Sequence, residues 1–156
     1  MPKIAGVNLL GVLLGAIAMF FIGFVWYGLL FTQPWMEANG LFLSGEGESA
    51  VMQWLTAEGV QSSAGGPEPM IMLAGFVQSL VLCFGLGWFM KQQAVTGTSA
   101  AVMFGLWASL LIGVPLAAYD TIYTPWHSIT GLLVDGSHTV ATFIVACAIL
   151  AMFDKG

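Results

Sequence analysis

The sequence predicts an all-α, polytopic membrane protein with four transmembrane helices in a bundle and a short amphipathic helix outside it. Of its 156 residues, 58% are hydrophobic and only 7% are charged, and the mean hydropathy is +0.91. Soluble domains are about 45–50% apolar and about 25% charged, so this chain has too few charges to cover a surface that faces water. Its apolar runs of about 20 residues match a hydrocarbon core of about 30 Å, and they lack the alternation of a membrane barrel.

The first span is expected over about residues 4–31. Trp26 and Tyr27 lie close to its end, where amphipathic aromatic rings anchor a helix at the membrane–water interface. Gly11 and Gly15 lie four residues apart on one face, and such small residues let two helices approach closely in lipid. The partner of this face is either a helix of the same chain or the same helix of a second copy.

The long polar segment at residues 32–69 is expected to form an extracytoplasmic cap. Pro34 favours the first turn of a short helix, and Asn39 followed by glycine would end that helix. Ser49 is a suitable N-cap for a second, amphipathic helix over residues 50–58. Its apolar residues would share one face and lie on the membrane surface or over the mouth of the bundle.

The remaining spans are expected at about residues 70–90, 99–119 and 128–153. Pro115 should kink or loosen the last turn of the third span, because proline lacks a backbone N–H. Small residues recur on one face of several spans, and they predict close helix packing. The positions concerned are Gly11, Gly15, Gly105, Ser109, Gly113 and Gly131.

Three lysines predict the orientation. With four crossings, Lys3, Lys91 and Lys155 all fall on one side, which the positive-inside rule makes cytoplasmic. Both termini are then cytoplasmic, and the acidic cap is outside. The first and third spans also leave the membrane through similar sequences, F-T-Q-P-W at 31–35 and Y-T-P-W at 123–126. This echo suggests that a two-helix unit was duplicated.

The candidate functional residues gather between residues 119 and 142, which contain two carboxylates and the two histidines of the chain. Asp135 and His138 are three residues apart on one helix and would point the same way, so they could bond each other. Ionisable groups within a membrane span usually face the protein interior and mark a functional site. Other side chains expected at the same level are Tyr119, Asp120, Tyr123, His127, Trp26, Tyr27 and Trp35.

Three interpretations of this cluster remain open. Asp135 and His138 could be a structural pair that locks helix packing, or the floor of an outward-facing pocket for a small ligand, an ion or a proton. Alternatively, Asp120, His127, Asp135 and His138 could ligate a metal in a membrane enzyme, although their spacing matches no metal motif. The sequence contains no nucleophile elbow, phosphate loop or zinc-protease motif, and no cofactor is expected.

The residues at the end of the first span carry a family resemblance. The chain reads G-F-V-W-Y at 23–27, then Phe31 and P-W-M at 34–36, and it has Asp135 and His138 in its last span. This pattern resembles a bacterial family of small membrane proteins catalogued as a domain of unknown function, the 1761 family. The resemblance covers most of the chain, and it implies four membrane helices and lends no activity.

The resemblance is weakest at residues 41–69, and Thr32-Gln33 stand where the family pattern has a glycine and a lysine.

Taken together, the composition and the resemblance predict a multi-pass protein of the bacterial inner membrane that contacts lipids and no nucleic acid. The leading expectation for function is a non-catalytic accessory or scaffold subunit that packs with other membrane proteins or with its own copies. Binding or translocation of a ligand, ion or proton at Asp135 and His138 is the alternative, and a metal-binding enzyme is the third.

Overall fold

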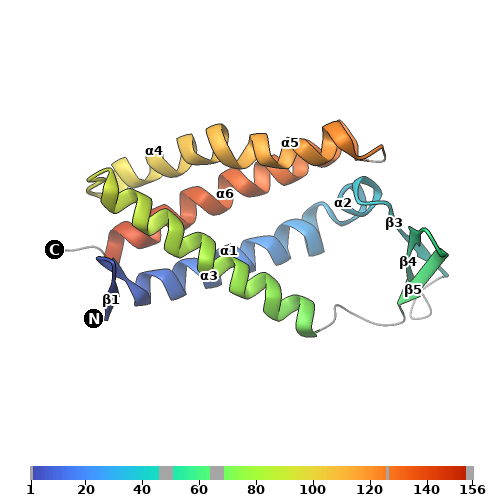
Figure 1. Ribbon diagram of the computed structural model, residues 1–156, viewed down its shortest axis with the longest axis horizontal. Helices are drawn as coiled ribbons and strands as arrows, with labels where there is room; N and C mark the ends of the chain where they lie inside the picture. Colours follow the sequence, from blue (N-terminus) through green and yellow to red (C-terminus); the bar gives the residue numbers. More distant parts are fainter. Residues whose placement is uncertain (1, 46–50, 64–68, 126, 154–156) are drawn as a thin grey trace.

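The structure is a computed structural model that describes residues 2–45, 51–63, 69–125 and 127–153 (Figure 1). Within these residues, four helices are long and apolar enough to cross a membrane. We call these four helices the helical body. They are Leu9–Leu30 (α1, Leu9–Val25, with η1, Trp26–Leu30), Pro69–Gln92 (α3), Thr98–Tyr123 (α4, Thr98–Ala108, with η3, Ser109–Gly113, and α5, Val114–Tyr123) and Ile129–Phe153 (α6).

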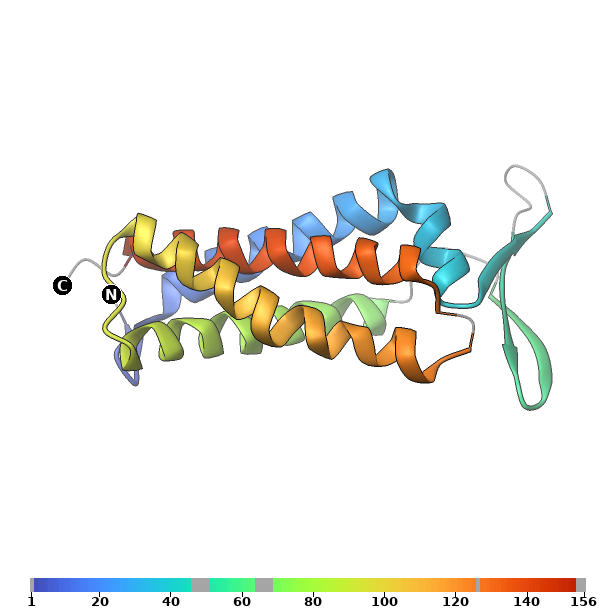
Figure 2. The same cartoon turned by 90° about the horizontal axis from the view of Figure 1, so that it is seen from above.

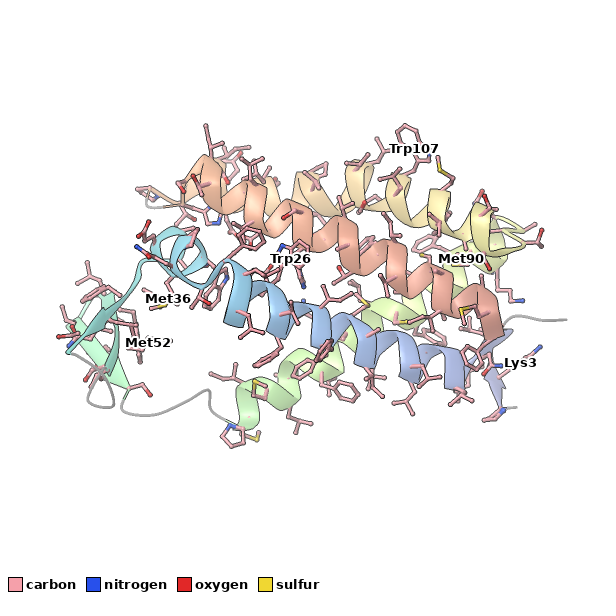
Figure 3. All side chains as sticks on the ribbon, turned by 180° about the vertical axis from the view of Figure 1, so that it is seen from behind. Lys3, Trp26, Met36, Met52, Met90 and Trp107 are labelled. Carbon is pink, nitrogen blue, oxygen red and sulfur yellow. The ribbon has the colours of Figure 1, made fainter. Side chains whose placement is uncertain are left out.

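The two ends of the helical body differ. At one end, which we call the sheet end, the chain forms the short helix α2 (Thr32–Ala38) and the strands β3 (Leu41–Ser44), β4 (Val51–Thr56) and β5 (Gly59–Ser63) (Figure 2). The two chain termini lie at the other end, which we call the terminus end. Lys3 lies there (Figure 3), and Lys91 lines a small cavity at the same end beside Val7 and Asn8. Two of the three lysines are thus at one end, and Lys155 lies outside the described residues.

The first helix starts later than expected, at Leu9 instead of about residue 4. Residues before it form a hairpin of β1 (Lys3–Ile4) and β2 (Val7–Asn8), with a turn at Ala5 and Gly6, whose φ angles are +48° and +80°. Asn8 explains the boundary, because its side-chain oxygen accepts hydrogen bonds from the backbone of Leu10 and Gly11, at 3.0 and 3.5 Å. Its amide nitrogen also donates to the Phe153 carbonyl, at 3.0 Å, which ties the start of α1 to the end of α6.

α6 is the central helix, since it packs against α1, α2, α3, α4 and α5. The core that surrounds it combines residues of α1, α3, α4 and α6, including Ala16, Cys83, Ala101 and Ala146, which are all fully buried. The opposite faces of the spans are covered by exposed apolar side chains. This distribution is that of a protein whose surroundings are lipid, and Trp107 on α4 projects from that surface (Figure 3).

Small residues bring the helices close together, but they do so within the chain. A Cβ atom added at Gly11 would lie 3.1 Å from Phe153, and one added at Gly15 would collide with Cys83. A Cβ at Gly105 would lie 2.7 Å from the Phe143 carbonyl oxygen. Gly113 and Gly131 are equally confined, and Ser109 is fully buried. The stripe on the first helix is therefore occupied by α3 and α6, which leaves no room there for a second copy.

Both spans that run from the terminus end to the sheet end contain a π-helical stretch, η1 in the first and η3 in the third. η1 ends where the Phe31 N–H donates to the Trp26 carbonyl, at 2.8 Å, and it leads directly into α2. η3 immediately precedes α5, in which Pro115 occupies the first turn. Pro115 cannot donate a backbone hydrogen bond, and its ring displaces the carbonyl one turn earlier, so a wider turn is a natural accommodation. The helix then continues to Tyr123, beyond the expected end at 119.

The cap segment is only partly as expected. The short helix α2 forms, and Asn39 and Gly40 end it. The amphipathic helix expected at residues 50–58 is wrong, because Val51–Thr56 is strand β4, paired with β3 and β5 on its two sides. Its expected N-cap Ser49 lies outside the described residues. Gly59 has a φ of +106°, so it provides the tight turn that folds β5 back onto β4.

Gly105 offers a direct test of the packing around α6. Gly105→Ala should lower the free energy of unfolding by about 1–3 kcal/mol, because the added methyl group overlaps the backbone of α6 at Phe143. Thermal unfolding of the purified protein in detergent measures the change. Gly75→Ala is the matched control, since a Cβ there meets only the Phe20 ring at an ordinary 3.6 Å. Equal unfolding temperatures for the two variants would contradict the packing described above.

Candidate functional site

Five polar side chains converge at the sheet end of the helical body. We call them the polar cluster: Tyr27, Thr121, His127, Asp135 and His138. At its centre the Nε2 atom of His127 lies 3.3 Å from the Asp135 carboxylate. The His127 side chain is 3% exposed and that of Asp135 is 22% exposed. The pair joins the chain segment between α5 and α6 to the second turn of α6.

His127 is held in place by local backbone structure. Its N–H donates to the Thr124 carbonyl, at 3.1 Å, which closes a turn with Pro125 in its preferred second position. Ser128 then begins α6, because its hydroxyl accepts from the Gly131 N–H, at 3.2 Å. Gly131 lacks a side chain where one would collide with both Ala38 and the His127 ring. The imidazole can therefore lie against the first turn of α6, under α2.

The second ring nitrogen of His127 also has a partner. Nδ1 lies 2.9 Å from the Thr121 hydroxyl on α5. A hydroxyl can donate to the Nδ1 atom of a neutral imidazole and can accept from the N–H of a protonated one. The Asp135 carboxylate accepts from Nε2–H in both states. The same geometry therefore serves His127 with and without the additional proton.

Tyr27 links this pair to His138. Its side chain lies close enough to the Asp135 carboxylate to interact with its charge, and its ring centroid lies 4.7 Å from that of His138. The ring of Trp35 on α2 also contacts the Tyr27 ring, with centroids 5.4 Å apart. Beneath these rings the Nε2 atom of His138 is buried and has no hydrogen-bond partner among the described residues. Such an orphaned polar atom costs about 1–3 kcal/mol and calls for an explanation.

The structure corrects the expected pairing of Asp135. The side-chain hydrogen-bond partner of Asp135 is His127, whereas the ring of His138, three residues further along α6, lies at a tilt against the Tyr27 ring. The relevant partner is eight residues away in sequence, because the turn at 124–127 folds His127 back over the helix. Thr121 was not expected in the cluster, and only its position one helical turn before Pro125 could have suggested it.

Four other expected residues lie apart from the cluster. Tyr119, Asp120 and Tyr123 are exposed on α5, and the rings of the two tyrosines contact each other, with centroids 5.1 Å apart. Trp26 lies between α1 and α6 (Figure 3) and donates from its indole nitrogen to the Ser137 hydroxyl, at 3.1 Å. Ser137 was also not expected from the sequence, although it lies two residues from Asp135.

The candidate metal ligands are only partly brought together. His127 and Asp135 meet, but Asp120 is exposed on α5. Among the described residues, no three His, Cys, Asp or Glu side chains form a group that could hold a metal ion. The chemistry that the cluster supports is therefore hydrogen bonding and proton exchange between an imidazole and a carboxylate.

The His127–Asp135 contact makes a stability prediction. Asp135→Ala should lower the free energy of unfolding by about 1–3 kcal/mol, because it leaves the buried Nε2 atom of His127 without a partner. Asp120→Ala is the control: it is also a helical aspartate, but it is exposed, so its effect should stay within about 0.5 kcal/mol. Thermal unfolding in detergent compares them. A loss of stability in Asp120→Ala alone would refute the assignment.

Comparisons with known proteins identify the family. No curated protein and no solved structure matches the chain. The family described as "Protein of unknown function (DUF1761)" matches residues 10–151. This range runs from the first turn of α1 to the last turn of α6 and includes every residue of the polar cluster. The chain therefore belongs to the family of proteins of unknown function DUF1761.

Proposed function

We propose that this membrane protein takes up and releases a proton at the polar cluster. The observation that carries the proposal is the buried, unpartnered Nε2 atom of His138, next to Tyr27 and the Asp135 carboxylate. Imidazole is the side chain whose charge changes near neutral pH. Ionisable groups placed together within membrane spans are typical of proton sites.

A proton fits this cluster because it requires no cavity of its own. The rings of Tyr27, Trp35 and His138 are in contact, and the His127 ring fills the space above Gly131. The hydrogen bonds of His127 also accommodate both protonation states without movement of the ring, as described above.

The surroundings favour exchange at the sheet end over passage through the protein. Other titratable groups of the elements packed here point away: Glu37 of α2 bonds Gln33 and is exposed, and Asp120 of α5 is exposed. Further along α6 the buried residues are apolar, apart from Thr142, whose hydroxyl is committed to the carbonyls of His138 and Thr139. The cluster therefore lies nearer to the sheet end than to any polar group further along α6, and the proposal assigns it no catalytic step.

His138→Phe tests this proposal. Phenylalanine keeps an aromatic ring against Tyr27 and removes the unpartnered nitrogen, so the protein should unfold at the same or a higher temperature. Infrared difference spectra of the protein in lipid vesicles, recorded between pH 5 and pH 8, should lose part of their carboxyl and imidazole signal. Asp135→Asn should remove the carboxyl part of the signal.

The control for this experiment is Asp120→Asn, which changes an exposed carboxylate at the same end of the helical body. It should leave the buried carboxyl signal of the parent protein intact. A role in packing alone predicts a different result: the pH-dependent spectra of Asp135→Asn and of the parent protein would then agree. That outcome would exclude a proton site at the cluster.

A second candidate function is that of an accessory or scaffold subunit that packs with other membrane proteins or with its own copies. One observation favours it. Gln78 of α3 is exposed in the middle of a helix that is long and apolar enough to cross a membrane. An amide in hydrocarbon is costly unless it is hydrogen-bonded, so a partner at this surface would stabilise the protein.

We also propose that the protein resides in a bacterial inner membrane with both termini in the cytoplasm. The proposal rests on Lys3 and Lys91, which lie at the terminus end, and on the positive-inside rule. A cysteine introduced at exposed Ala57 should react with a membrane-impermeant maleimide added outside the cell, and one at exposed Gln93 should react only after lysis. The native cysteines Cys83 and Cys147 are buried and provide the unreactive background. The reverse labelling pattern would invert the orientation.

A further inference from the structure

Gln78 is a polar residue exposed near the middle of α3. Gln78 lies about 14 Å from one end of α3 and about 21 Å from the other, at about 1.5 Å per residue. A hydrocarbon core of about 30 Å centred on this helix therefore places Gln78 near its middle. Its side chain is too short to carry the amide to either interface, unlike the long side chains of lysine and arginine.

The geometry of α3 fixes the direction of this side chain. The buried residues of the helix, Cys83, Leu86, Gly87 and Met90, face α1 and α6. At about 3.6 residues per turn, Gln78 lies on the opposite face, together with exposed Val81. Within the described part of the chain its amide has no hydrogen-bond partner. The hydroxyl of the neighbouring Ser79 donates to the Gly75 carbonyl and does not bond the Gln78 amide.

The outer face of α3 carries two small residues near Gln78, among larger exposed side chains such as Val81 and Leu82. Ala74 lies one turn before Gln78, and Gly85 lies two turns after it on the same face. A Cβ added at Gly85 would meet no atom within 4 Å, so this part of the surface is open. Small residues on both sides of a polar side chain let a second helix approach until its own polar group can bond with it. By contrast, the space beside Gly11 and Gly15 of α1 is occupied by residues of α3 and α6.

We propose that two copies of this chain associate through the outer face of α3, with the Gln78 amides paired across a two-fold axis. The amide carries both donors and an acceptor, and a two-fold axis sets the same residue of the second copy opposite it. Each Gln78 then donates to the carbonyl oxygen of the other, and both amides are satisfied by one contact. A purely apolar neighbour would leave the amide unsatisfied. The inference deepens the second candidate function and does not depend on proton binding at the polar cluster.

Energy transfer in lipid vesicles tests the association. Full-length protein is labelled with a donor or an acceptor fluorophore at Gln93→Cys. Position 93 is exposed, and the native cysteines are buried and so should stay unlabelled. The parent protein should show transfer that rises with the protein-to-lipid ratio. Gln78→Leu should weaken association about 10-fold, in the range measured for hydrogen bonds between membrane helices. Gln78→Asn keeps the hydrogen-bond donor and acceptor of the amide and should retain most of the association.

Both substitutions should leave the unfolding temperature in detergent unchanged, because the Gln78 side chain contacts no partner within one chain. A monomeric parent protein at all ratios, or equal association of Gln78→Leu and the parent protein, would overturn the inference.

Crosslinking in native membranes identifies the neighbour directly. A bismaleimide applied to Gly85→Cys should give a product with the mass of two copies, and Gln78→Leu should abolish it. A product that contains only a different protein would overturn pairing of two copies while leaving the accessory function in place. Absence of any product, together with absence of energy transfer, would overturn both.

Discussion

The arrangement of this protein depends on one constraint: in hydrocarbon, a polar group must find its partner inside the protein. Most polar side chains of the helical body obey it with local bonds. The hydroxyl groups of Ser109 and Thr142 donate to backbone carbonyls of their own helices. Asn8 caps α1 and hydrogen-bonds the end of α6, and the Asp135 carboxylate bonds His127. These contacts determine where α1 begins, how α6 is anchored at both ends, and how the α5–α6 turn folds.

The second requirement is close approach, since lipid provides no hydrophobic force between helices. Glycines meet it wherever α6 crosses a neighbour: Gly11 beside Phe153, Gly105 beside Phe143, and Gly131 beneath Ala38 and His127. The last of these connects packing to the polar cluster. Without a side chain at Gly131, α2 and the imidazole of His127 can both lie on the first turn of α6, and the His127–Asp135 contact follows from that proximity. The same small residue thus serves the fold and the site.

The sequence predicted what depends on composition and spacing. The four spans follow from the lengths of the apolar runs, and the inward-facing position expected for Asp135 and His138 follows from the cost of charge in lipid. Contacts that depend on turn geometry were not accessible. Residues 4–8 were expected to belong to the first helix because the apolar run begins at about residue 4, whereas the backbone at Ala5 and Gly6 folds residues 3–8 into a hairpin. The apolar residues of Val51–Thr56 would also fit one face of a helix, but the segment forms strand β4 because its backbone pairs with β3 and β5. His138 was paired with Asp135 on helical spacing alone, whereas the turn at Pro125 brings His127 closer.

Two polar groups are exceptions to the constraint, and they differ in a way that separates their roles. His138 Nε2 has no partner among the described residues and lies among tightly packed rings, so whatever satisfies it must be small. Gln78 is unpartnered at the surface, beside small residues that leave space, so whatever satisfies it can be as large as another helix. The first lies on α6, where the chain is most closely packed; the second lies on α3, on the face turned away from every other helix. A change at one position therefore has no direct contact through which to alter the other, and the two roles can be measured independently.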